Sequence, residues 1–184
     1  MNCLGVLLAA GASRRFGPRN KLLASYRGKP LVNAAATALL GAGCEAVIAL
    51  LTAPEVADVL PPGLEPQWLP PGLPMAASFC RAIDLAIARK SASLLICLGD
   101  MPNITSTLLC RLRTQTRSHA CETQDYRTPP LLLSAADYIT ARSTATGDQG
   151  ARQFLKTLGP NALFHISTAE ALDIDYPDDS PSST

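Results

Sequence analysis

A short loop of small side chains follows the first apolar run of the sequence and leads directly into basic residues. Small side chains let backbone N–H groups approach phosphate oxygens closely, and glycine adopts positive φ without steric cost. Arginine and lysine then supply the positive charge that a polyphosphate needs. This composition predicts a phosphate-binding loop, but a solvated surface turn has the same composition and neither common phosphate-loop spacing is present. After Leu8, the small residues include Ala9, Ala10, Gly11, Ser13 and Gly17, and the basic residues are Arg14, Arg15, Arg19 and Lys21.

Carboxylates occur in two places from which they could reach that loop. Asp100 follows the apolar run at residues 94–98, so a strand formed by this run would carry it to the same sheet edge as the loop. Asp173 and Asp175 are separated by one apolar residue and would share one face of a short strand. A hard divalent cation prefers carboxylate ligands. The alternatives are a turn aspartate at position 100 and a solvated acidic end of the chain.

The charge of the chain is nearly balanced but unevenly distributed. The formal net charge is +1, from 16 Lys+Arg and 15 Asp+Glu. The first 44 residues contain no acidic side chain, and the last fifteen contain no basic one. This division is consistent with an anion site near the start and a cation site near the end, or with two differently solvated faces. The low net charge indicates neither a nucleic-acid partner nor binding to an anionic membrane.

The six cysteines form no CxxC pair, and the two histidines, His119 and His165, are far apart in the sequence. We predict buried free thiols in a reducing compartment, without a zinc site or a catalytic triad. The apolar runs are shorter than the roughly 20 residues that span a bilayer. No positive charge precedes the first apolar run, as it would in a secretory signal. We therefore expect a cytoplasmic protein without a membrane helix.

Strands and helices alternate along the predicted secondary structure. Runs that are apolar throughout are typical of strands buried on both faces. The alternation predicts a single α/β domain over residues 1–178, with three α/β/α layers, a mostly parallel sheet and a flexible tail at 179–184. The clearest strands are expected at 4–9, 46–52 and 94–98. The clearest helices are expected at 30–40 with Pro30 in the first turn, at 75–90 with the apolar stripe Phe79, Ile83, Ala86 and Ile87, and from Thr105 or Ser106 onward.

The remaining segments are less regular. Residues 61–74 hold six of the 15 prolines, which predicts a loop with an edge strand at 67–69. Periodicity is lost over residues 121–130, so no regular element is expected there. Strands are expected at 131–133 and 162–166, and short helices at 135–142 and 149–158.

Four motifs occur in order along the chain and together resemble one family. The loop reads L-A-A-G from Leu8, residues 99–102 read G-D-M-P, residues 147–152 read G-D-Q-G-A-R, and residues 173–179 read D-I-D-Y-P-D-D. These motifs resemble the molybdopterin nucleotidyltransferase-like branch of the nucleotidyltransferase superfamily. Within this branch, the chain is most similar to the molybdenum cofactor cytidylyltransferase family. The resemblance implies a Rossmann-like nucleotidyltransferase fold.

The resemblance also implies a reaction and a metal. A phosphate monoester would attack the α-phosphorus of a nucleoside triphosphate and release pyrophosphate. Such a transfer depends mainly on positioning and charge neutralisation, and no strong base is required because the second pKa of a phosphate monoester is about 6. The implied cofactor is Mg²⁺, held by Asp100 and Asp175, with Asp175 chosen over Asp173.

The same resemblance assigns roles to individual side chains. Lys21 and Arg15 would hold the triphosphate and stabilise the departing pyrophosphate, and together with Asp100 they are the predicted catalytic residues. Asp148 and Arg152 are further candidates, although a partly buried ion pair at a helix start explains them equally well. The predicted nucleotide-binding residues are Leu8, Ala9, Ala10, Gly11, Ser13, Arg15, Lys21, Ser78 and Asp100.

Substrate choice is the finest implication of the resemblance. Ala10 favours CTP, the implied acceptor is the phosphate of molybdopterin, and the implied protein partner is a molybdoenzyme or its chaperone. No nucleic-acid or membrane partner is expected. Two departures fall on the acceptor side: Pro74 replaces a glycine, and Arg127, Thr128 and Pro129 replace a G-N-P or G-H-P segment. An enzyme that uses GTP or a sugar phosphate and a noncatalytic nucleotide-binding module of the same fold are therefore the alternatives.

Overall fold

The computed structural model of the chain describes residues 2–11, 16 and 20–174. Three predicted site residues, Ser13, Arg15 and Asp175, lie outside the described residues, as does the predicted tail at 179–184. Within the described part of the chain, no helix is long and apolar enough to cross a lipid bilayer.

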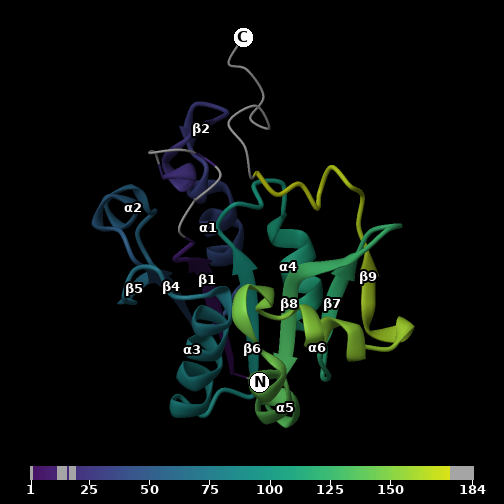
Figure 1. Cartoon of the computed structure of the whole chain (residues 1–184). Coiled ribbons are helices and arrows are strands. Elements are labelled where there is room, and N and C mark those ends of the chain that lie inside the picture. The colour runs from purple at the N-terminus through teal and green to yellow at the C-terminus, as the bar shows by residue number, and fades with distance from the viewer. Residues whose placement is uncertain (1, 12–15, 17–19, 175–184) are drawn as a thin grey trace.

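A seven-stranded sheet forms the centre of the fold (Figure 1). Its strands lie in the order β5 (Glu65–Trp68), β4 (Ala46–Leu51), β1 (Cys3–Ala9), β6 (Ser93–Leu98), β8 (Arg127–Ser134), β7 (His119–Glu122) and β9 (Leu163–His165). Parallel pairs join β5 to β4, β4 to β1, β1 to β6 and β7 to β9, whereas β8 is antiparallel to both of its neighbours. The predicted mostly parallel sheet is therefore confirmed.

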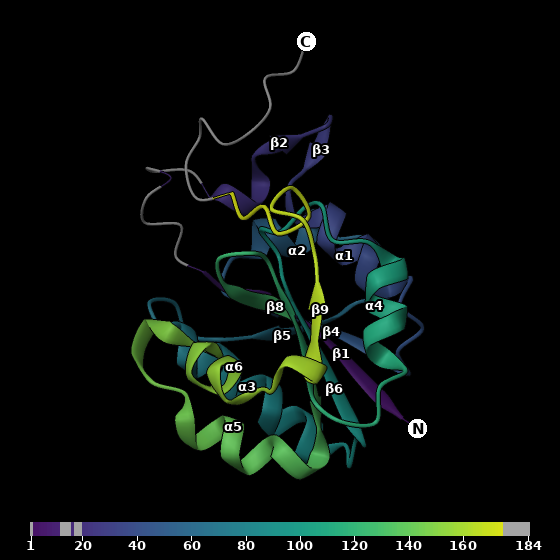
Figure 2. The same ribbon diagram turned by 90° about the vertical axis from the view of Figure 1, so that its right-hand side faces the viewer.

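Helices cover both faces of this sheet (Figure 2). Side chains of β1 alternate between the two helical layers because successive strand residues point to opposite faces. Leu7 and Ala9 join one core, and Leu4 and Val6 join the other. The predicted three-layer architecture is confirmed. One layer contains α1 (Val32–Leu40), α2 (Pro54–Val59) and α4 (Ser106–Arg113), and the other contains α3 (Met75–Ala88), α5 (Tyr138–Thr144) and α6 (Arg152–Thr157).

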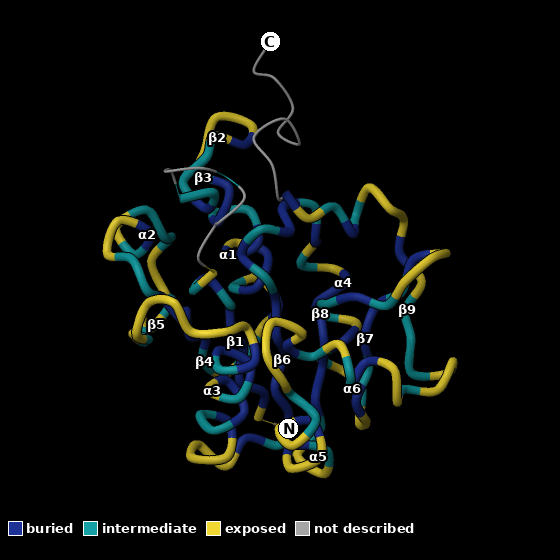
Figure 3. The backbone as a smooth tube through the Cα atoms, viewed as in Figure 1, coloured by how far each residue is buried: buried dark blue, intermediate teal, exposed yellow. Residues whose placement is uncertain are grey.

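The three strands expected to be buried on both faces are β1, β4 and β6, and each lies within one residue of its predicted bounds. Their residues are almost all buried, as Figure 3 shows for the centre of the sheet. Helices on both sides remove side chains of both orientations from water, and this burial stabilises the fold by about 25 cal/mol per Å² of apolar surface. The smaller expected elements are also present, as β5, β9, the 3₁₀ turn Ala135–Asp137 with α5, and α6. Two further 3₁₀ turns, Gly147–Gln149 and Pro160–Ala162, were not expected.

The cysteines are free thiols, as predicted. Burial raises the pKa of the Cys97 thiol because a thiolate there would lose its hydration. Such a thiol is a packing group rather than a nucleophile. Cys3, Cys97 and Cys121 are buried, and Cys44, Cys80 and Cys110 are partly buried.

The expected place of Pro30 in the first turn of a helix is wrong. Pro30 ends a short hairpin of β2 (Ser25–Tyr26) and β3 (Lys29–Pro30), and α1 begins after it at Val32. Gly28 adopts a φ of +77° in the hairpin turn, a conformation that glycine tolerates without steric cost. The hairpin lies above the carboxyl ends of the central strands (Figure 1).

The expected burial of Ile87 is also wrong. The buried stripe of α3 includes Phe79, Ile83 and Ala86, but Ile87 is 42% exposed. An α-helix turns about 100° per residue, so Ile87 is rotated away from Ala86 and from the sheet. The apolar stripe of α3 is therefore narrower than its sequence indicates.

Residues 121–130, where no regular element was expected, contribute to two strands. β7 and β8 form an antiparallel pair with a register shift between Ala120 and Cys121. Pro129 and Pro130 fall at this shift, where no ladder pair includes them. Proline has no N–H to donate to a ladder hydrogen bond, and it is tolerated at a bulge because no such bond is needed there. The bulge explains why strand periodicity is lost in the sequence although strands form.

A capping contact in α4 gives a stability prediction. The Thr105 hydroxyl accepts a hydrogen bond from the Leu108 N–H at 3.2 Å. Thr105→Ala removes this acceptor and should lower the free energy of unfolding by about 1 kcal/mol. Thr107→Ala, in the exposed first turn of the same helix, is the matched control. Urea denaturation of both variants checks the prediction, and equal stabilities would show that the cap contributes nothing.

Candidate active site

The carboxyl ends of β1 and β6 lie side by side at one edge of the sheet. Leu8 pairs with Leu98, and the Gly99 N–H donates to the Leu8 carbonyl at 3.0 Å. A Cβ atom at position 99 would lie 3.3 Å from a methyl group of Leu22 and 3.4 Å from that carbonyl oxygen, so little free space remains around Gly99. Asp100 therefore emerges beside the start of the loop that follows β1. Ligands of open α/β sheets bind at this edge.

Lys21 and Asp100, two of the predicted catalytic residues, form an ion pair at this edge. Lys21 Nζ lies 2.6 Å from Asp100 Oδ2, and the two side chains are only 11% and 17% exposed. The lysine belongs to a 3₁₀ turn, Lys21–Leu23, whose first N–H groups are capped by Asn20. The Asn20 side chain accepts from the Leu22 N–H at 3.1 Å. The turn thus directs a cation toward the carboxylate at the end of β6.

One oxygen of Asp100 has no hydrogen-bond partner among the described residues. This oxygen, Oδ1, is buried, whereas Oδ2 contacts Lys21. A buried carboxylate oxygen without a partner is costly until a cation or water binds it. Asp173 lies nearby, with Oδ1 3.7 Å from Lys21 Nζ. Two carboxylates therefore lie around one ammonium group, and one of them carries an open coordination position.

The C-terminal segment reaches the site because it is attached to the loop after β6. The Ile174 N–H donates to the Asp100 carbonyl at 3.2 Å. The Ile174 side chain is fully buried in a small apolar cluster that includes Tyr26 of the hairpin. These contacts hold Asp173 beside the site. Asp175 lies outside the described residues, so its choice as a metal ligand stays a prediction.

The carboxylates fit a divalent cation such as Mg²⁺. Mg²⁺ in proteins is usually held by one or two carboxylates, with substrate phosphates and water as the other ligands. Asp100 Oδ1 supplies a buried oxygen, and Asp173 supplies a second carboxylate. Residues 2–11, 16 and 20–174 contain no cluster of three or more His, Cys, Asp or Glu side chains that could hold a metal. The remaining ligands would therefore have to come from the nucleotide, water or residues beyond these ranges.

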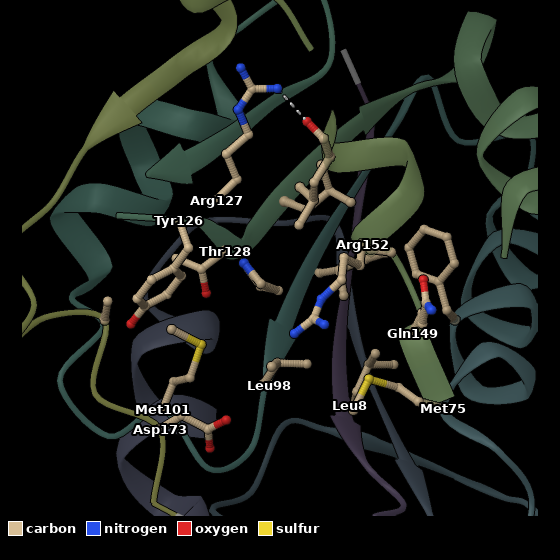
Figure 4. Close-up of a pocket in the computed structure, with 18 of the residues that line it drawn as sticks. Leu8, Met75, Leu98, Met101, Tyr126, Arg127, Thr128, Gln149, Arg152 and Asp173 are labelled. Atoms are coloured by element: carbon tan, nitrogen blue, oxygen red, sulfur yellow. Dashed lines mark hydrogen bonds between the residues drawn. The ribbon is translucent and has the colours of Figure 1, made fainter. Parts of the chain in front are cut away.

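A cavity of about 480 Å³ opens beside the ion pair (Figure 4). Its floor is formed by the ends of β1 and β6, and its walls by Met75 and Phe79 of α3, by β8 and by residues 148–152. Asp173 lies at its border, so the cavity and the Lys21–Asp100 pair are adjacent. Its apolar lining includes Leu8, Met75, Leu98 and Met101, and its polar lining includes Tyr126 and Arg152.

Arg127, one of the departures on the acceptor side, has a structural contact. Its Nη1 donates to the carbonyls of Leu155 and Lys156 at 2.9 and 3.1 Å. These carbonyls belong to the last turn of α6, where the only backbone donor to Leu155 among the described residues is the capping Leu158 N–H at 3.3 Å. Arg127 therefore attaches α6 to β8, and Figure 4 shows its side chain directed toward the helix and away from the cavity floor.

Asp148 and Arg152 do not form the ion pair that one interpretation of the sequence suggested. Asp148 Oδ1 instead accepts from the N–H of Met75, the first residue of α3, at 3.4 Å. An unpaired N–H and the positive end of a helix dipole favour a carboxylate at this position. Arg152 has no hydrogen-bond or ion-pair partner in the part of the chain that the structure describes, and its guanidinium points into the cavity (Figure 4).

The other predicted nucleotide-binding residues are spread around this edge. Leu8 lines the cavity, whereas the side chain of Ala9 is buried on the α1 side of the sheet and leaves only its backbone for a ligand. Ala10 is half-buried and Gly11 is exposed after the end of β1. Ser78 is buried in the first turn of α3 and does not line the cavity. Nucleotide contacts at these positions stay predictions.

Residues 5–163, which include every strand and helix except the first two residues of β1 and the last two of β9, match the MobA-like NTP transferase domain family. The chain belongs to this family. Lys21, Asp100 and Arg152 lie within the matched residues, and Asp173 lies beyond them. A MobA-like NTP transferase domain implies a nucleoside triphosphate as substrate and agrees with a triphosphate site beside Lys21.

Relatives of this MobA-like chain differ in their described activities. The chain is 34% identical over 169 residues to nicotine blue oxidoreductase from Paenarthrobacter nicotinovorans. This match covers 83% of the chain and 80% of the relative. A solved nucleotidyl transferase from Methanothermobacter superposes with a TM-score of 0.81 at 20% identity, covering 97% of this chain and 94% of the other. Rv0371c from Mycobacterium tuberculosis superposes with a TM-score of 0.80 at 24% identity over the same shares, and another structure of that protein is a complex with manganese. The nucleotidyltransferase fold is thereby confirmed.

Proposed function

We propose that this MobA-like protein is a divalent-metal-dependent cytidylyltransferase, which transfers CMP from CTP to a phosphate monoester and releases pyrophosphate. The acceptor proposed first is the phosphate of molybdopterin, and Mg²⁺ is the proposed metal. The observation that carries the proposal is Asp100, which pairs with Lys21 through one oxygen and leaves its other oxygen buried without a partner among the described residues. A metal–triphosphate complex would satisfy both groups at once.

The residues of the site divide the work of binding and orientation. Asp100 and an aspartate of the C-terminal segment, Asp173 or Asp175, would hold the metal, which supplies charge neutralisation for the triphosphate. Lys21 would turn from Asp100 to the triphosphate and stabilise the negative charge that develops on the leaving pyrophosphate. The acceptor phosphate is already ionised at neutral pH because its second pKa is about 6. The protein therefore has to align this phosphate with the α-phosphorus and exclude water.

The choice of CTP rests on Ala10 and on the resemblance of the L-A-A-G loop to cytidylyl-transferring enzymes. The choice of molybdopterin rests on the same resemblance and on a cavity of about 480 Å³ beside Asp173, which has room for a fused heterocycle. Pro74 sits at the start of α3 and presents no N–H to a ligand. At the start of α3, an acceptor would therefore be bound by side chains and not by a backbone N–H of residue 74.

Pyrophosphate release tests the proposal. The full chain is incubated with Mg²⁺, each of the four ribonucleoside triphosphates in turn, and molybdopterin, with glucose 1-phosphate as a second acceptor. Release only with CTP and molybdopterin is expected. Release with GTP or with the sugar phosphate would replace the proposed substrate, and tight CTP binding without release with any acceptor would indicate a noncatalytic nucleotide-binding module.

A redox activity is the second candidate, favoured by the 34% identity to nicotine blue oxidoreductase and by the apolar lining of the cavity. A coloured aromatic substrate such as nicotine blue would fit apolar walls, but its reduction needs an electron donor. Absorbance measurements with nicotine blue and NADH or NADPH test this candidate. Rapid loss of colour that requires the protein would support it over nucleotidyl transfer.

A further inference from the structure

We propose that Arg152 binds the phosphate of the acceptor, and that the cavity selects phosphate monoesters carried on a flat ring system. This inference rests on the proposed function and narrows its acceptor. It separates two classes that the motifs leave open, aromatic or heterocyclic phosphates and sugar phosphates.

Arg152 is the only charged side chain lining the cavity that lacks a partner among the described residues. Arg127 donates to carbonyls of α6, Asp148 accepts from the N–H of Met75, and Asp173 lies beside Lys21. Figure 4 shows the Arg152 guanidinium directed over the end of β6 at Leu98. A guanidinium has five N–H donors and no acceptor, and its planar fork matches two oxygens of a phosphate. The ligand that completes the cavity should therefore carry an anion.

The segment that carries Arg152 is held in place on both sides. Asp148 attaches the 3₁₀ turn Gly147–Gln149 to the start of α3, and Arg127 attaches the other end of α6 to β8. Gly150 lies against Met75, because a Cβ atom there would approach the Met75 side chain to 3.0 Å. Anchoring at both ends reduces the entropy that Arg152 loses when it binds an anion.

Five side chains of the cavity offer apolar surface to a ligand beside Arg152. Leu8 and Leu98 form the floor, and Met75, Met101 and Tyr126 form the sides. Met75 is 47% and Tyr126 is 51% exposed, so both have surface available to a ligand. Methionine adapts its shape to flat ligands, and tyrosine stacks on them. The lining also includes the polar side chains Thr128 and Gln149. A sugar hydroxyl that faces Leu8, Leu98 or Met75 would leave water without gaining a partner, which costs affinity.

Isothermal titration calorimetry of the full chain tests the inference with 1-naphthyl phosphate, 1-naphthol and glucose 1-phosphate as probes. α,β-Methylene-CTP and Mg²⁺ are present at saturation, so that the triphosphate site is already occupied. We expect 1-naphthyl phosphate to bind at least roughly tenfold more tightly than either other probe, because a charged hydrogen-bonding pair is lost with naphthol and apolar contact is lost with the sugar.

Three arginine variants test whether Arg152 causes the preference for 1-naphthyl phosphate. Arg152→Gln should lose most of the preference for 1-naphthyl phosphate over 1-naphthol, and Arg152→Lys should retain part of it. Arg117→Gln, at an exposed position away from the cavity, should behave like the native protein. Unchanged binding of α,β-methylene-CTP to Arg152→Gln shows that this variant is folded.

Two results would overturn the inference: equal affinity of Arg152→Gln and the native protein for 1-naphthyl phosphate, or equal affinity of the native protein for glucose 1-phosphate and 1-naphthyl phosphate. Failure of the proposed function looks different. In that case α,β-methylene-CTP does not bind, while the three probes, titrated without it, still report on the cavity.

Discussion

Asp100→Asn is expected to slow pyrophosphate release by about a thousandfold, since a bound metal contributes several kcal/mol to transition-state stabilisation and each 1.36 kcal/mol is tenfold in rate. The amide keeps the shape of the side chain but removes the charge that holds the metal. Asp100 Oδ1 is the buried oxygen without a partner among the described residues. A neutral amide at this position lacks the negative charge that would attract the cation. A coupled pyrophosphate assay at saturating CTP and Mg²⁺ measures the effect.

Asp84→Asn is the matched control for this variant. Asp84 pairs with Arg142 on the surface between α3 and α5, and both side chains are well exposed. Its loss should leave the rate unchanged, because exposed ion pairs contribute about 0–1 kcal/mol to stability and this one is remote from the cavity. An Asp100→Asn variant that retains more than a tenth of the native rate would remove Asp100 from the metal site.

Lys21→Met is expected to reduce kcat/KM for CTP by roughly a hundredfold or more, the usual cost of losing one group that stabilises developing charge. Methionine keeps an unbranched apolar stem of similar length but carries no ammonium. The lysine is only 11% exposed and contacts both Asp100 and Asp173. Steady-state kinetics with varied CTP measure the change, and Lys156→Met, at an exposed position in the last turn of α6, is the control.

The same variant should bind a divalent cation more tightly in the absence of nucleotide. In the structure, the Lys21 ammonium neutralises Asp100 and lies 3.7 Å from Asp173, so it competes with a cation for the same carboxylates. Removing it should raise the affinity for Mn²⁺ even as turnover falls. Mn²⁺ titration followed by electron paramagnetic resonance checks this. Weaker Mn²⁺ binding together with slower turnover would instead indicate that Lys21 supports the local fold.

The central strands could be predicted from the sequence because their environment is simple. A run such as residues 94–98 is apolar at every position, and only burial on both faces accommodates it. β8 was harder to predict, because Pro129 and Pro130 disrupt the pattern at a register shift that depends on the neighbouring β7. α2 (Pro54–Val59) was not predicted, since its single buried residue, Val56, gives no helical periodicity.

Some contacts of the site could be predicted from the sequence, and others depend on residues that are distant along the chain. The sequence predicted that Asp100 and the loop containing Lys21 would meet, because both follow parallel strands that end at one edge. It did not predict the contact of Asp148 with the start of α3, since nothing local to position 148 indicates a partner 73 residues away. The contact of Arg127 with the end of α6 spans 28 residues and has no local signal either. In the sequence alone, Asp148 and Arg127 could bind a ligand as readily as they could hold helices in place, because their partners are distant along the chain.

In the proposed mechanism, Asp100 would hold a divalent cation that neutralises the charge of the triphosphate. Crystals of the full chain with α,β-methylene-CTP and Mn²⁺, measured at a wavelength where manganese scatters anomalously, test it most directly. The expected result is an anomalous peak within coordination distance of Asp100 Oδ1 and of a carboxylate oxygen of Asp173 or Asp175, with Lys21 Nζ on the triphosphate. A manganese peak remote from Asp100, with Lys21 still paired to Asp100 in the nucleotide complex, would contradict it.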